Sequence, residues 1–139
     1  MAEYLSLAMA AKLLTALLLG GMAWFSFVFA PMAFKKLPKE TAGTFISHVF
    51  PVYYWAGLAL AVGAMLAGGW TDRIILACVA GMFGVGLFVF IPVLDGLREK
   101  ARAEDPVAKA AFGRWHGISM VVNLAQIIAV LIAFIRLAA

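Results

Sequence analysis

The chain has 139 residues, of which 65% are hydrophobic and only 13% are charged, and its mean hydropathy is +1.02. A soluble domain is roughly half apolar and about a quarter charged. A water-soluble protein of this size could not bury the apolar excess, so the composition excludes an ordinary soluble enzyme and predicts a lipid-facing surface. The single cysteine, Cys78, excludes an intrachain disulfide and a cysteine-based metal cluster.

Four charge-free stretches predict four membrane-spanning helices, since about 20 helical residues cross a ~30 Å hydrocarbon core. They cover residues 13–34, 41–71, 74–94 and 115–135. The expected spans are about 6–33, 51–70, 74–94 and 115–137. The second span is placed to begin at Pro51, because a proline is best tolerated in the first helical turn. The fold class expected for residues 1–139 is therefore all-α, a single integral membrane four-helix bundle.

Between spans one and two, the residues from Pro38 to Pro51 predict a short amphipathic helix that lies on the membrane surface. On a helical wheel its apolar and polar side chains fall on opposite sides. The apolar set is Phe45, Ile46, Val49 and Phe50, and the polar set is Thr41, Thr44, Ser47 and His48.

The later connections carry turn and capping signals. Residues 68–73 form a short connection that makes spans two and three antiparallel neighbours. Asp105 and Pro106 are typical of a helix start, with Asp105 as N-cap and Pro106 in the first position, so the last helix is expected to begin near Pro106. No internal repeat is evident.

Basic residues concentrate in the connections at 31–50 and 95–114. These two loops contain Lys35, Lys36, Lys39, Arg98, Lys100, Arg102, Lys109 and Arg114. The positive-inside rule then makes both loops cytoplasmic and both termini external, in a multi-pass protein of the cell (inner) membrane. We read the positive charge as a preference for anionic lipids, with no nucleic acid as partner. The expected headgroup ligands are Lys35, Lys36, Lys39, Arg98 and Arg114.

The last span contains the most informative pattern. Its polar residues His116, Ser119, Asn123 and Gln126 lie at i, i+3, i+7 and i+10 and share one helix face. Gln126 lies about 15 Å further along the axis than His116. Because lipid cannot hydrogen-bond these side chains, the face is expected to point into the bundle or towards a neighbouring subunit. Three interpretations stay open: helix–helix hydrogen bonding, a polar substrate or ion path, and contact with a ligand or cofactor.

We expect these residues to form one cluster with the first loop, either a structural latch or a ligand pocket, and favour the latch. Asn123 is expected to bond a backbone carbonyl or a residue such as Ser26. His116 is expected to contact the segment Ser47–Tyr53, which adds Ser47, His48 and Tyr53 to the cluster. A haem or metal held between His48 and His116 is a minor alternative. No catalytic set is present, and no cofactor or metal is expected.

Small residues recur at four-residue spacing in the first three spans and predict close helix approach. The pairs are Ala16 with Gly20, Gly57 with Ala61, and Ala77 with Gly81.

Two blocks of residues carry a family resemblance. The first comprises Gly21–Val28, Phe34–Pro38, Thr41, Gly43, Ser47 and Phe50–Tyr53; the second comprises Leu97–Lys100, Asp105, Pro106, Phe112, Arg114–Ser119, Asn123 and Leu124. On these residues the sequence resembles the transmembrane protein 205-like family, which includes bacterial four-span domains of unknown function. The resemblance implies a four-helix membrane domain. The eukaryotic members of this family are linked to drug resistance and secretion.

The leading functional hypothesis is a non-enzymatic multi-pass membrane protein that acts through self-association or as an accessory subunit of a larger membrane complex. It rests on the small-residue faces and the lack of a catalytic set. The alternative is a small transporter or resistance-associated permeation protein, which would use the polar face of span four. A second alternative is a haem- or metal-binding redox protein.

Overall fold

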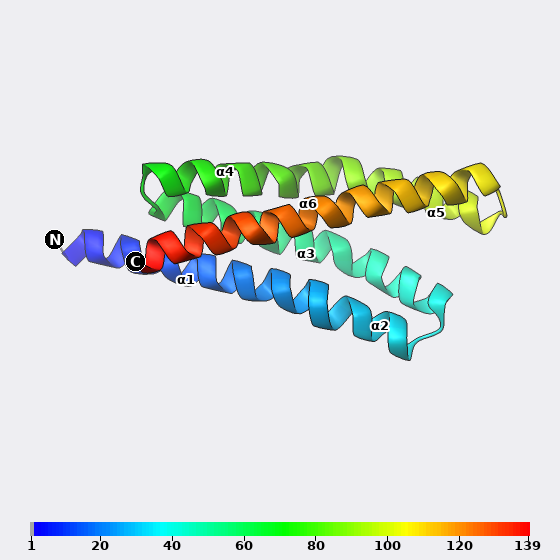
Figure 1. The fold of residues 1–139 in the computed structure, drawn as a ribbon, viewed down its shortest axis with the longest axis horizontal. Coiled ribbons are helices and arrows are strands. Elements are labelled where there is room, and N and C mark those ends of the chain that lie inside the picture. Colours follow the sequence, from blue (N-terminus) through cyan, green and yellow to red (C-terminus); the bar gives the residue numbers. More distant parts are fainter. Residues whose placement is uncertain (1) are drawn as a thin grey trace.

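The computed structural model describes the backbone of residues 2–139 and the side chains of residues 6–139. The chain forms four long helical rods, joined end to end and packed side by side, with both termini at the same end (Figure 1). The first rod comprises α1 (Ala2–Trp24), η1 (Phe25–Phe29) and α2 (Ala30–Lys36), and the second is α3 (Lys39–Ala67). The third comprises α4 (Trp70–Val85), η2 (Gly86–Phe90) and α5 (Ile91–Arg102), and the fourth is α6 (Pro106–Ala138).

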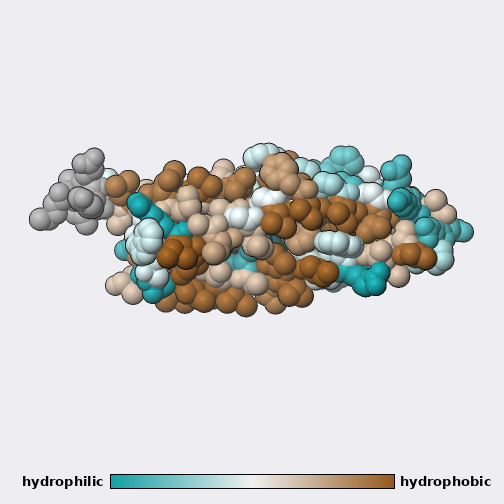
Figure 2. Space-filling view, turned by 90° about the horizontal axis from the view of Figure 1, so that it is seen from above, coloured by the Kyte–Doolittle hydropathy of each residue, from teal (hydrophilic) through white to brown (hydrophobic). Residues whose placement is uncertain are grey.

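All four rods are long and apolar enough to cross a membrane. The qualifying helices are Ser6–Lys36, Lys39–Ala67, Trp70–Arg102 and Pro106–Ala138. Apolar side chains cover the middle of the molecule, and polar ones gather at its two ends (Figure 2). The predicted all-α four-helix bundle and the multi-pass membrane character are thereby confirmed.

The rods form a closed ring. α1 packs against α3 and α6, α3 packs against α4, and α4 and α5 pack against α6. The first and third rods therefore lie opposite each other, as do α3 and α6. At the centre the side chains of Phe83, Leu18, Met22, Leu76 and Val130 are almost completely buried.

The predicted surface helix between spans one and two is not a separate element. Residues from Lys39 onwards belong to α3, which runs without interruption through Pro51 to Ala67, so Pro51 is interior and not in the first turn. The apolar side of this segment packs into the bundle, since Ala42 is 0% and Ile46 3% exposed. That packing holds the helix together across a proline, which removes one backbone hydrogen bond. The helix also ends at Ala67, short of the expected limit at residue 70.

A short repeat, not evident from composition, becomes visible in the structure. The string Phe-Val-Phe-x-Pro occurs at residues 27–31 and again at 88–92. At both places the helix widens into a π-helical turn, in η1 and η2, just before the proline. A proline lacks an N–H and crowds the carbonyl four residues earlier, and a wider turn relieves both problems. The first and third rods are thus equivalent in local structure as well as in position.

Close packing of α3 against the third rod depends on two glycines. A Cβ atom on Gly57 would collide with the Phe83 ring, and one on Gly86 would collide with the Tyr54 ring. Small residues at helix interfaces in membranes permit this approach, because association there rests on van der Waals packing.

The two ends of the bundle are closed by polar contacts. At the end that carries both termini, Arg136 Nε pairs with Asp72 Oδ1 at 3.0 Å and Arg73 Nε donates to the Gly68 carbonyl at 2.9 Å. At the opposite end, Asp105 accepts hydrogen bonds from the amides of Val107 and Ala108, which confirms the predicted N-cap of α6. We call this opposite end, with the α2–α3 and α5–α6 connections, the basic end.

We predict that Gly86→Ala destabilises the bundle by about 1–3 kcal/mol, because the added methyl group overpacks against Tyr54. Gly84→Ala is the matched control on the same rod, since its Cβ would meet nothing within 4 Å. The control is expected to be neutral, or to gain up to ~1 kcal/mol from helix propensity. Unfolding in detergent micelles measures both. Equal effects of the two substitutions would contradict the proposed Gly86–Tyr54 interlock.

Candidate functional site

The side chain of Asn123 joins three rods. Its Nδ2 donates to Ser26 Oγ in η1 at 2.8 Å, and its Oδ1 accepts from the Tyr53 hydroxyl of α3, also at 2.8 Å. The predicted partnership of Asn123 with Ser26 is confirmed, and Tyr53 is indeed part of the cluster. We call these three residues the Asn123 latch. Both ends of the amide have protein partners, which is the condition for placing an amide among apolar helices.

Tyr53 is held in position by aromatic packing. Its ring stacks on Phe25 with centroids 4.3 Å apart and an interplanar angle of 20°, and it meets Tyr54 and Phe83 edge-on. The hydroxyl can therefore reach α6 from α3 although these helices lie on opposite sides of the ring. Helical periodicity could not identify this pairing, because it depends on how far a long side chain reaches across the bundle.

The rest of the polar face of α6 also points inwards, as predicted. Gln126 is 4% exposed, and its Nε2 donates to the Val79 carbonyl of α4 at 3.1 Å. Ser119 is 9% exposed and donates to the His116 carbonyl at 2.7 Å. The face thus bonds α6 to each of the other three rods.

The contact of His116 with Ser47–Tyr53 stays a prediction, since no hydrogen bond or ring contact joins them among the described residues. His116 instead stacks on Phe112, one turn earlier on its own helix, with ring centroids 5.9 Å apart and an interplanar angle of 5°. The Arg98 guanidinium of α5 lies 5.5 Å from the centroid of the Phe112 ring on the same stretch of α6.

His48 and Ser47 lie on α3 and both bond to the Thr44 carbonyl. His48 is exposed and its Nδ1 donates at 2.8 Å, while Ser47 Oγ donates at 2.7 Å. His48 and His116 have different partners, and each partner lies on the residue's own helix. Within the described residues, no group of three or more His, Cys, Asp or Glu side chains is placed to hold a metal ion.

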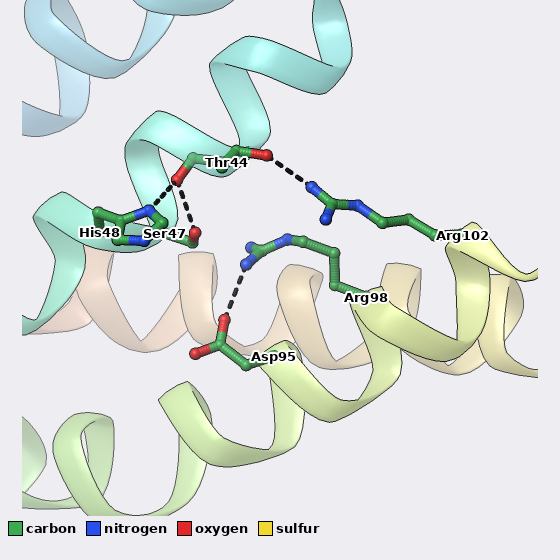
Figure 3. Close-up of polar contacts among 6 residues, drawn as sticks. All are labelled: Thr44, Ser47, His48, Asp95, Arg98 and Arg102. Atoms are coloured by element: carbon green, nitrogen blue, oxygen red, sulfur yellow. Dashed lines mark hydrogen bonds and ion pairs between the residues drawn. The ribbon is translucent and has the colours of Figure 1, made fainter.

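Two arginines of α5 extend towards α3 at the basic end (Figure 3). Arg98 pairs with Asp95 at 2.7 Å, and Arg102 donates to the Thr44 hydroxyl. Sequence reasoning missed the Arg102–Thr44 contact, since nothing in either segment indicates the other. Lys35, Lys36, Lys39 and Arg114 are exposed at the same end, whereas Arg98 is mostly enclosed.

These features define a small multi-pass α-helical membrane protein whose interior polar groups hold its helices together. The chain belongs to the family described as "Domain of unknown function (DUF4149)", which matches residues 13–103. It is also similar to an uncharacterized protein of Aquifex aeolicus (strain VF5), with 36% identity over 122 residues, 82% of this chain and 86% of the relative. No protein of known structure matches the chain.

We predict that Asn123→Ala lowers the stability of the bundle by about 1–3 kcal/mol. Each interhelical hydrogen bond in a membrane contributes about 0.6 kcal/mol on average and up to ~1.7, and the substitution removes two. Leu131→Ala is the control, because Leu131 is 43% exposed on the same helix. Thermal unfolding in detergent compares them. A larger loss for Leu131→Ala would refute the latch.

Proposed function

We propose that this chain is a non-enzymatic membrane protein that acts by association, with a second copy or as an accessory subunit of a membrane complex. The observation that carries the proposal is that some small residues lie on the outer surface and take no part in packing within the bundle. Gly57 packs against Phe83 of the third rod, and Ala61 is fully buried inside the bundle. Gly20 and Gly81 are exposed, and a Cβ on either would meet nothing within 4 Å.

Gly20 and Gly81 occupy corresponding positions in the two equivalent rods, each eleven residues before its proline. Ala77, one turn from Gly81, is also exposed. Large exposed side chains flank these positions, including Trp24 on the first rod and Met82 on the third. In a bilayer, a small residue on an outer face lets another helix approach closely, which favours packing between subunits.

The use of the inner polar residues also supports association over transport. Asn123 has both ends of its amide bonded to protein, and the Gln126 side chain bonds a backbone carbonyl. These contacts suit a latch between helices, the interpretation favoured from sequence. We further propose that the chain is related to the transmembrane protein 205-like proteins. Their link to drug resistance keeps a small transporter as the alternative function, tested by flux through liposomes containing the protein.

Association is tested by the mass of the protein in mild detergent. We expect an oligomer or a co-purifying partner. Gly20→Leu combined with Gly81→Leu should raise the dissociation constant of the assembly roughly tenfold or more, which is equivalent to about 1.4 kcal/mol. Ala125→Leu, on the exposed face of α6, is the control for added bulk. A monodisperse monomer without any co-purifying partner would overturn the proposal.

We propose the cell (inner) membrane as the location, with the basic end in the cytoplasm. Seven basic residues are exposed there, and four of them are predicted headgroup ligands: Lys35, Lys36, Lys39 and Arg114. Each basic residue near an anionic leaflet contributes roughly 1 kcal/mol to attraction. This makes anionic lipid headgroups the natural ligands of these four residues. Arg98, paired with Asp95, is a structural residue in this proposal.

The orientation is tested with a reporter fused after Ala139. We expect activity from a reporter that works only outside the cytoplasm, because the termini lie at the end opposite the basic residues. A cytoplasm-only reporter serves as the matched control and should be inactive. The reverse result would overturn the orientation, and with it the assignment of the four basic residues to the anionic cytoplasmic leaflet.

A further inference from the structure

A small cavity lies between α3, α5 and α6 on the basic-end side of the latch. The centre of a water-sized sphere can occupy about 10 Å³ of it. That is close to the smallest space that holds one water molecule on this measure. Its walls include apolar residues such as Phe90 and Leu94, and the polar and charged residues Ser47, Tyr54, Asp95, Arg98 and Ser119. A polar cavity of this size differs from an empty apolar void, which stays dry.

The Tyr54 hydroxyl has no hydrogen-bond partner among the described residues. Tyr54 is only 6% exposed, and its ring is fixed beside the rings of Phe50 and Phe83. Side chains of an α-helix lean towards its N-terminus, which for α3 is the basic end. The phenol is therefore directed towards the cavity that it lines. Every fully buried side-chain oxygen or nitrogen among the described residues has a hydrogen-bond partner. The Tyr54 hydroxyl has none, so it reaches space that a water molecule can enter, and a water there would satisfy it.

Ser47 and Ser119 supply hydrogen-bond acceptors to the cavity. Ser47 Oγ donates its proton to the Thr44 carbonyl, and Ser119 Oγ donates its proton to the His116 carbonyl, each at 2.7 Å. A hydroxyl has one proton and two lone pairs. Both serines therefore present only acceptors to the cavity, while Tyr54 presents a donor.

We propose that the cavity binds one water molecule, which accepts from the Tyr54 hydroxyl and donates to the hydroxyls of Ser47 and Ser119. Water matches both the volume and the donor–acceptor pattern. Asp95 and Arg98 also line the cavity, and they pair with each other at 2.7 Å, so the carboxylate is already neutralised and a metal cation is disfavoured. The water would connect α3 to α6, as Tyr53 does directly through Asn123. Two adjacent tyrosines would then join helices that lie on opposite sides of the ring.

The first test uses Tyr54→Phe, Ser119→Ala and the double variant. If a shared water bridges the residues, each single variant lowers the melting temperature by roughly 2–4 °C, and the double variant loses clearly less than the sum. No direct bond joins the two side chains, so non-additivity shows that they are coupled through the shared cavity. A clear loss on Tyr54→Phe then identifies the coupling as a bound water, because only a bonded hydroxyl stabilises the protein. In a dry cavity, Tyr54→Phe removes an unsatisfied hydroxyl and should be neutral or stabilising. That outcome, or additive losses, would overturn the proposal.

Thr15→Val combined with Tyr54→Phe is the control pair, since Thr15 is buried in α1 and bonds its own helix. Its losses should add. A second measurement requires no variant: hydroxyl radicals generated from bound water by X-ray irradiation label adjacent side chains. We expect labelling of Tyr54 in the intact protein, with Phe83, which is 0% exposed, as the unlabelled internal control. Equal protection of both residues would show a dry cavity.

Discussion

The structure depends on one constraint: inside a bilayer, every polar group needs a partner within the protein, because lipid offers none. Asn123 meets this requirement through Ser26 and Tyr53, and Gln126 meets it through the Val79 carbonyl. These bonds reach all three other rods from α6. Helix association in lipid rests on van der Waals packing and on interhelical hydrogen bonds, and these polar contacts tie the fourth rod to each of the others.

A second consequence of the same constraint concerns the backbone. Three rods contain a proline that removes a helical hydrogen bond, Pro31, Pro51 and Pro92. At Pro31 and Pro92 the helix widens into a π-helical turn, while at Pro51 it continues as an α-helix. The widened turns bring Ser26 to the latch and place Gly86 against Tyr54. Both π-helical turns therefore supply residues to contacts between helices.

The side chains inside the bundle and those on its outer surface have different roles. Inside, the polar side chains of α6 are occupied by contacts that hold the rods together. Outside, exposed glycines and large apolar side chains alternate along the first and third rods. We therefore look for function on the outer faces and at the basic end, where lysines are exposed, and regard the interior as the framework that presents them.

Composition and charge by themselves determined the number of helices and the two polar ends, because few folds can place so many apolar residues in lipid. Helical periodicity also determined that Ser119, Asn123 and Gln126 face inwards, and local capping chemistry determined the start of α6 at Asp105. Periodicity gives an angle about a helix axis, but neither the neighbouring helix nor the reach of a side chain. The tertiary structure alone decided that Tyr53 reaches Asn123, that Arg102 meets Thr44, and that His116 stacks on Phe112. It also decided that residues 39–51 continue into α3, since the packing of Ala42 and Ile46 in the bundle outweighs the break expected at Pro51.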